Sequence, residues 1–292
     1  MGLAQRAAIA SVATACFLLA LKSYAAAETG SVAMLGSLAD TGLDLVASLV
    51  TLSGVRIAAT PADEDHRFGH GKAEALAALF QVTLITLSAA GIAWRAVIRL
   101  MHGGETANAE YGIAVSIIAL IATGLLIIYQ RRILARSGSI AIRADNVHYQ
   151  SDLLLNGSVI AAIVLDQYLG IGGADPLFGV AIALWLGWGA WRSASVAIDQ
   201  LMDKEWPEEK RQHFLAIAAR HPELRGIHDL RTRTSGTRDF VQFHVDVAPD
   251  MTVAEAHRVM EEVEARLASD FPGVEILIHP DPQGRARQRR KP

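Results

Sequence analysis

The chain has 292 residues, and its 27 lysines and arginines nearly balance 30 aspartates and glutamates, giving a formal net charge of −3. So small a charge gives no support for nucleic-acid binding, and the single cysteine, Cys16, excludes a disulfide framework and a thiolate zinc site. Residues 1–200 carry only 12 of the basic and 14 of the acidic residues. This distribution predicts an apolar membrane part followed by an ordinary soluble part.

Six apolar segments in the first 200 residues are long enough to cross the ~30 Å hydrocarbon core of a membrane. They are residues 7–27, 31–59, 73–100, 111–134, 140–169 and 176–200. The first has some features of a signal peptide, but it is long and further segments follow, so we interpret it as a retained span. Nine lysines and arginines fall on the side of the termini and three on the other side. Both termini are therefore expected in the cytoplasm.

Two pairs of metal-binding residue types lie inside these segments: Asp40 with Asp44, and His148 with Asp152. Each pair has i, i+4 spacing, so it presents two ligands on one helical face. A carboxylate at membrane depth costs about 3 kcal/mol or more, which favours a compensating cation. In antiparallel helices Asp40 should face Asp152 and Asp44 should face His148 near the midplane. The alternative is a set of helix-packing polar residues or proton carriers without a metal.

A second cluster lies in the loop after the second segment, where Asp63, His66 and His70 fall within eight residues. Pro61 and Gly69 interrupt helix formation there. These side chains predict a loop metal site. A solvated polar turn that happens to contain histidines is an equally good interpretation of the spacing alone.

The C-terminal part has the pattern of a small α/β domain, in the order α-β-β-α-β with the helices on one face of the sheet. Helices are expected at 207–220 and from Thr252, where Glu255 completes a capping box. Strands are expected at 226–234, 239–247 and 274–279. The predicted domains are residues 1–203 in the membrane, 204–284 in the cytosol and a basic tail at 285–292. The tail is expected to be disordered, with weak attraction to anionic lipid as a second interpretation.

Histidines accumulate in this domain, on or beside its strands and second helix. His228, His244, His279 and Asp281, with His257 nearby, predict a cytosolic metal site. Surface histidines scattered by chance are the alternative, which composition by itself favours.

Four separated motifs carry a family resemblance. They are Ser37-Leu-Ala-Asp40-Thr-Gly-Leu-Asp44, Asp65-His-Arg-Phe-Gly-His-Gly-Lys-Ala-Glu74, Arg143-Ala-Asp-Asn-Val-His-Tyr-Gln-Ser-Asp152 and Ile278-His-Pro-Asp281. Their order over nearly the whole chain resembles the cation diffusion facilitator family, in particular its bacterial zinc/iron-type exporters. The resemblance implies a homodimeric metal/proton antiporter of the bacterial inner membrane, with six transmembrane helices and a metallochaperone-like cytosolic domain.

The resemblance also implies roles for individual residues. Asp40, Asp44, His148 and Asp152 match the transport site, Asp63, His66 and His70 match the loop site, and His228, His244, His257, His279 and Asp281 match paired cytosolic sites. Lys72 and Asp203 match an interlocking charge pair at the dimer interface. Gln283 stands where some close relatives have a cysteine, so the chain departs from the family pattern at the second cytosolic ion.

These observations predict a transporter rather than an enzyme. Three carboxylates and one imidazole suit Zn²⁺, while Cd²⁺, Fe²⁺, Co²⁺ and Mn²⁺ fit the same donor types. His148 is the expected proton-coupling residue, since its ordinary pKa is nearest to neutrality. A membrane-anchored metal sensor and a manganese- or cobalt-selective member of the family are the alternatives. An intramembrane metalloenzyme is disfavoured because all four ligand positions are protein side chains.

Overall fold

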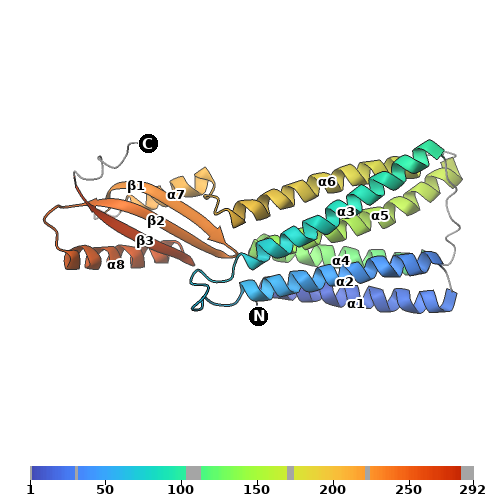
Figure 1. Cartoon of the computed structure of the whole chain (residues 1–292), viewed down its shortest axis with the longest axis horizontal. Coiled ribbons are helices and arrows are strands. Elements are labelled where there is room, and N and C mark those ends of the chain that lie inside the picture. The colour runs from blue at the N-terminus through green and yellow to red at the C-terminus, as the bar shows by residue number, and fades with distance from the viewer. Residues whose placement is uncertain (1, 30–31, 103–112, 170–173, 221–223, 284–292) are drawn as a thin grey trace. The chain divides into compact units, whose positions relative to one another are not determined.

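Long helices form the N-terminal part of the chain in the computed structural model, which describes residues 2–29, 32–102, 113–169, 174–220 and 224–283 (Figure 1). Within these residues the long helices number six: α1 (Leu3–Thr29), α2 (Val32–Ala58), α3 (Ala73–His102), α4 (Ile113–Ser137), α5 (Ile140–Leu169) and α6 (Ala174–Leu201). Each coincides with one of the six predicted segments. The mostly helical character of this part is therefore confirmed, whereas six membrane crossings stay a prediction.

Four stretches of these helices are long and apolar enough to cross a membrane: Leu3–Glu28, Ser37–Ala58, Ala73–Ile98 and Ile117–Ser137. They belong to α1, α2, α3 and α4. Large apolar side chains are exposed on the outside of the helices, including Phe17, Leu43, Leu87, Trp94, Leu125, Leu184 and Trp191. Contact of such a surface with lipid tails is favourable, whereas its exposure to water would cost free energy. The protein is thus a multi-pass membrane protein.

Small side chains line the contacts between the helices. Ala7 and Ala8 of α1, Ala77 of α3 and Ala141 of α5 are buried in one core cluster. At Gly54 of α2, a Cβ atom would lie 2.5 Å from the Cβ of Ala77. Such close approach lets van der Waals contact hold helices together in lipid, where apolar burial gives little driving force.

The chain divides into two units, Met1–Ile198 and Asp199–Pro292. The second unit contains α7 (Glu208–Ala218), β1 (Arg225–Ser235), β2 (Arg238–Val247), α8 (Val253–Asp270) and β3 (Val274–Pro282). The strand order is β1-β2-β3, with β1 antiparallel and β3 parallel to the central strand β2. This is the predicted α-β-β-α-β order. The predicted boundary at 203/204 stays a prediction, and the basic tail lies outside the described residues.

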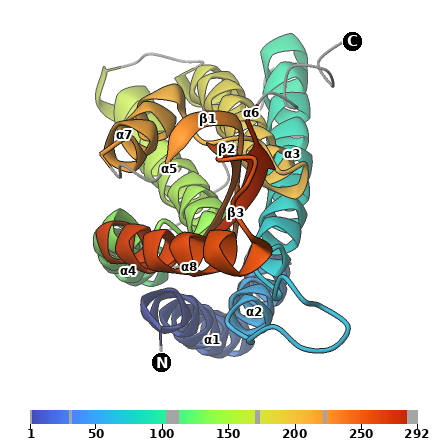
Figure 2. The same cartoon turned by 90° about the vertical axis from the view of Figure 1, so that its left-hand side faces the viewer.

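Alternation along β2 decides which face of the sheet becomes the core. Val241, Phe243 and Val245 are buried with Phe214 of α7 and Val263 of α8 in one cluster. Figure 2 shows both helices on the same side of the sheet. Since neighbouring residues of a strand point to opposite faces, the residues between these three point away from the core.

Local signals fix the ends of the C-terminal elements. Thr252 Oγ1 accepts from the backbone N–H of Glu255, and the Glu255 carboxylate accepts from the Thr252 N–H, so the predicted capping box is confirmed. The bond from the Thr252 N–H to the carboxylate, followed by one from the Thr252 hydroxyl, holds the pKa of Glu255 below its ordinary value. Strand β3 extends past its predicted end at His279 to Pro282. Prolines are tolerated there because β3 is an edge strand, where a missing N–H breaks no ladder bond on the open side.

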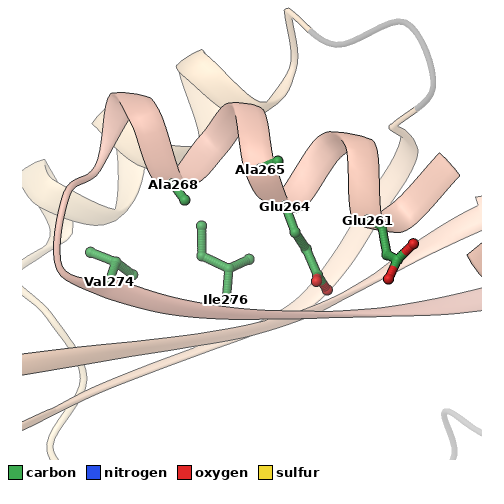
Figure 3. A pocket seen from close by; sticks show the side chains of 6 residues that line it. All are labelled: Glu261, Glu264, Ala265, Ala268, Val274 and Ile276. Carbon is green, nitrogen blue, oxygen red and sulfur yellow. The ribbon is translucent and has the colours of Figure 1, made fainter. Parts of the chain in front are cut away.

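A groove of about 370 Å³ lies between α8 and β3, lined by Glu261, Glu264, Ala265, Ala268, Val274 and Ile276 (Figure 3). Glu264 Oε1 accepts a hydrogen bond from the Ile278 backbone N–H at 3.2 Å. The glutamate thereby satisfies a backbone donor of the edge strand. None of the predicted metal ligands lines this groove.

Candidate metal sites

Three groups of metal-binding side chains converge within the described residues, one in each region where the sequence predicts a site. In each group the ligand atoms all lie within 4.8 Å of one another. Named after the locations that the sequence predicts, they are the intramembrane group (Asp44, His148 and Asp152), the loop group (Asp63, His66 and His70) and the cytosolic group (His228, His244 and Asp281). Asp63 and His66 of the second group are three positions apart in the chain, whereas Asp44 and His148 of the first are more than one hundred apart. Tertiary packing is therefore what assembles the first and third groups.

The intramembrane group joins α2 to α5. His148 Nε2 lies 3.0 Å from Asp44 Oδ1 and 3.9 Å from Asp152 Oδ2. The histidine side chain is buried, and its other ring nitrogen, Nδ1, has no hydrogen-bond partner in the described part of the chain. One imidazole nitrogen thus faces two carboxylates from different helices, an N/O donor set that suits Zn²⁺ and similar cations.

Asp40 lies outside this group. It is exposed and precedes Asp44 by one helical turn on α2. The structure therefore brings together three of the four predicted transport ligands, and the participation of Asp40 stays a prediction.

The loop group is organised by the Asp63 carboxylate, which holds the turn between α2 and α3. Asp63 Oδ1 accepts from the backbone N–H groups of His66 at 2.6 Å and Asp65 at 3.1 Å. The imidazoles of His66 and His70 lie 3.2 and 3.3 Å from its two oxygens. The His66 backbone bond is the main reason that the pKa of Asp63 is lowered. Gly69 has φ +75°, which permits the tight turn that returns His70 to the aspartate.

The cytosolic group is built by strand register. His228, His244 and His279 are Cα partners across β1, β2 and β3, so the three imidazoles form a row on the face opposite the core. Asp281 Oδ2 lies 2.8 Å from His244 Nδ1 and 3.4 Å from His228 Nε2, and Asp281 Oδ1 lies 3.4 Å from His279 Nε2. The hydrogen bond from His244 is the largest cause of the lowered pKa of Asp281. His228 Nδ1 lies 2.7 Å from the Gly226 carbonyl oxygen, which directs Nε2 toward the aspartate.

His257 lies apart from this row. It is exposed on α8, with Nε2 at 3.5 Å from Glu261 Oε1. Helix α8 covers the core face of the sheet, whereas the histidine row lies on the other face. The structure therefore does not bring His257 to the other four predicted residues within one chain.

The predicted charge pair consists of residues from the two different units. Lys72 lies in the turn before α3, and Asp203 lies in the turn after α6 with φ 54°. Within the second unit, Asp203 Oδ1 is 3.5 Å from Arg233 Nη1. A Lys72–Asp203 contact at a dimer interface stays a prediction.

Sequence reasoning assigned no role to Asp145, which is completely buried. Its Oδ2 accepts from Ser11 Oγ at 2.6 Å and Gln130 Nε2 at 2.7 Å, and its Oδ1 accepts from Gln81 Nε2 at 3.0 Å. These donors come from α1, α4 and α3. The network thus fixes α5 one turn before His148. The signal in the sequence is a further acidic residue on α5, three positions before the histidine.

The two family models that match the chain agree with this architecture. Residues 8–202 match the cation efflux transmembrane domain, and residues 206–283 match the cation efflux protein cytoplasmic domain. The chain is 41% identical over 280 residues to the cation-efflux pump FieF of Cronobacter sakazakii, covering 96% of this chain and 93% of that protein. It is 41% identical over 273 residues to FieF of Shewanella oneidensis, covering 94% and 92%. The solved metal-bound C-terminal domain of the CzcD transporter from Thermotoga maritima matches 28% of this chain and 99% of its own length, with 21% identity and a TM-score of 0.26.

Proposed function

The chain belongs to the cation efflux family, and on that basis we propose that it exports divalent metal cations from the cytoplasm in exchange for protons. The observation that carries the proposal is the convergence of Asp44, His148 and Asp152 from two helices of the apolar unit. Relatives that share about 40% identity over almost the whole chain are cation-efflux pumps, which fits a transporter rather than an enzyme.

All six long helices cross a bacterial inner membrane in this proposal, and both termini are cytoplasmic. Helices α5 and α6 complete the six spans predicted from the sequence. Exposed apolar residues of α6, such as Leu184 and Trp191, support its contact with lipid. Polar residues of α5, such as Asp145 and His148, are buried between helices and so avoid lipid.

The cation binds at the midplane between α2 and α5, with Asp40 joining the three residues that already converge. Metal ligands must be deprotonated, so cation binding releases protons and protonation releases the cation. His148 is the coupling residue because imidazole gains and loses a proton near neutral pH. Alternating access of the site to the two sides of the membrane then converts the inward proton gradient into outward metal transport.

Zn²⁺ is the favoured cargo, because three carboxylate oxygens and one imidazole nitrogen suit tetrahedral coordination. Cd²⁺ and Fe²⁺ are further candidates, and a manganese or cobalt preference is the alternative within the same family. These cations differ in preferred geometry rather than in donor type. A panel of divalent ions in one transport assay ranks them.

The protein acts as a homodimer, and the cytosolic group senses metal. The match to the cytoplasmic domain of cation efflux proteins supports this assignment. Metal bound at His228, His244 and Asp281 would neutralise the charge of Asp281 and draw the ligands together. By mass action, added metal then shifts the conformational equilibrium toward the metal-bound arrangement. Distance measurements between spin labels on the two cytosolic domains test this idea; a distance that does not change when metal is added contradicts it.

The main test is metal-dependent proton flux into proteoliposomes containing the full-length protein. Asp44→Ala should abolish both metal transport and the coupled proton flux, because it removes the carboxylate that faces His148. Asp250→Ala, an exposed aspartate outside all three groups, is the matched control. Normal zinc transport by Asp44→Ala would refute the site. Metal binding without any transport in the wild type would favour a membrane-anchored sensor.

A further inference from the structure

Lys22 is a basic residue inside the apolar helix α1. It lies within the stretch Leu3–Glu28, which is long and apolar enough to cross a membrane, and its side chain is partly buried. An ammonium group at membrane depth is costly, and basic residues are rare there unless they have a partner and a function. The proposed export cycle described above gives Lys22 no role.

The partners of Lys22 are neutral atoms on the helix that carries Asp44. Its Nζ donates to Thr41 Oγ1 at 2.7 Å and to the Ser37 carbonyl oxygen at 3.4 Å. The Thr41 hydroxyl in turn donates to the same Ser37 oxygen at 3.1 Å. The Thr41 hydroxyl therefore donates its hydrogen to a carbonyl of its own helix and accepts a hydrogen bond from the lysine. Because Thr41 is buried, this arrangement holds the ammonium at a defined place.

That place is beside the intramembrane metal group. Ser37, Thr41 and Asp44 have i, i+4, i+7 spacing, so they lie along one stripe of α2. The ammonium also interacts electrostatically with Asp152 of α5. Lys22 thus places a positive charge near Asp152, one of the carboxylates that are proposed to bind the cation. An ammonium has no lone pair, so it cannot itself be a ligand.

We propose that the fixed positive charge of Lys22 weakens cation binding at the intramembrane site and so speeds cation release. The inference rests on the proposed function, because it concerns the same site. A divalent cation and an ammonium repel each other, and the repulsion is strong where little water screens it. A pump needs release as much as capture, and dissociation limits turnover when binding is too tight.

The sign of the expected effect separates this role from a structural one. A lysine that only supports the helix packing would weaken the metal site when it is replaced. A lysine that repels the cation would tighten the site when its charge is removed. Lys22→Met keeps the length of the side chain and removes the charge, whereas Lys22→Arg keeps the charge.

The experiment measures equilibrium Cd²⁺ and Zn²⁺ binding to the full-length protein in detergent, by calorimetry, together with dissociation rates into excess chelator. All proteins carry Asp63→Ala and Asp281→Ala, so that the loop and cytosolic groups do not contribute. Lys22→Met should bind about tenfold more tightly and release the ion correspondingly more slowly. Lys22→Arg should bind more weakly than Lys22→Met, and Lys204→Met, an exposed lysine of the second unit, should change nothing.

Two outcomes distinguish the failure of the inference from the failure of the proposed function. If Asp44→Ala has no effect on binding, the intramembrane site itself is wrong. If Asp44→Ala abolishes binding but Lys22→Met leaves the affinity unchanged or lowers it, the role of Lys22 is wrong. Should Lys22→Met not fold, Lys22→Gln replaces it, since glutamine keeps a hydrogen-bond donor for Thr41 without the charge; the same tightening is then expected.

Discussion

The buried carboxylate of Asp145 allows a stability prediction that compares two substitutions at one position. Asp145→Ala removes the acceptor of three hydrogen bonds inside the helix bundle, those from Ser11, Gln81 and Gln130. A hydrogen bond between side chains contributes on average about 0.6 kcal/mol in membrane proteins, and about 1 kcal/mol or more in soluble proteins. Three such bonds predict a loss of about 2–4 kcal/mol in the free energy of unfolding.

Asp145→Asn should cost much less, about 1 kcal/mol. The new amide oxygen can take the place of Oδ2 and keep the bonds from Ser11 and Gln130. Its NH₂ group would then face Gln81, whose Oε1 is buried without a hydrogen-bond partner in the described part of the chain. A flip of the Gln81 amide presents that oxygen to the new donor and restores the third bond. Thr51 Oγ1, which accepts from Gln81 Nε2 at 2.9 Å in the wild type, must then donate to the same oxygen.

The assay is reversible unfolding of the full-length protein in mixed micelles, followed by a tertiary-structure signal, with Asp250→Ala as the control aspartate. The expected order of stability is wild type, then Asp145→Asn, then Asp145→Ala. Equal losses for both substitutions would refute the role of the Gln81 oxygen. A loss below about 0.5 kcal/mol for Asp145→Ala would refute the network as a source of stability.

Two further predictions concern the C-terminal unit. Asp281→Asn should weaken metal binding at the cytosolic group at least about tenfold, measured by calorimetry with Asp250→Asn as the control. Because the pKa of Asp281 is lowered in the folded chain, its carboxylate stabilises the fold at a pH above the ordinary carboxyl pKa of about 3.9. This contribution is lost as the pH falls through the lower folded pKa. The difference in free energy of unfolding between wild type and Asp281→Asn should therefore close in acid. Thr252→Ala should cost about 1 kcal/mol of stability in chemical denaturation, because the N–H of Glu255 loses its capping acceptor. Thr252→Ser keeps the acceptor, and a loss as large as that of alanine would contradict the capping explanation.

Local sequence patterns predicted the elements of this fold because each is governed by short-range physics. Apolar runs longer than the thickness of a membrane form helices, since lipid offers the backbone no other hydrogen-bond partners. Alternating residues from Asp239 to Val247 predicted a strand, and Thr252 with Glu255 predicted the start of α8. The loop group was also accessible from the sequence, because Asp63, His66 and His70 are neighbours in the chain and one carboxylate can hold the whole turn.

The sites formed by distant residues depended on tertiary structure. Strand register alone brings His228, His244 and His279 into one row, and a register shift of one residue would turn a histidine to the core face. The placement of α8 on that core face separates His257 from the row.

The membrane unit shows the same division between local and tertiary information. The sequence by itself determined that carboxylates and a histidine lie at corresponding depths in antiparallel helices, because helical rise and the positions along each segment fix the depth. Asp44 was expected to face His148, as it does in the structure. Only the tertiary structure decided that Asp40 lies outside their group, and that Asp145 and Lys22 take partners on other helices. The physical reason is that depth follows from one helix at a time, whereas contact depends on how each helix is rotated about its axis, and packing against all its neighbours sets that rotation.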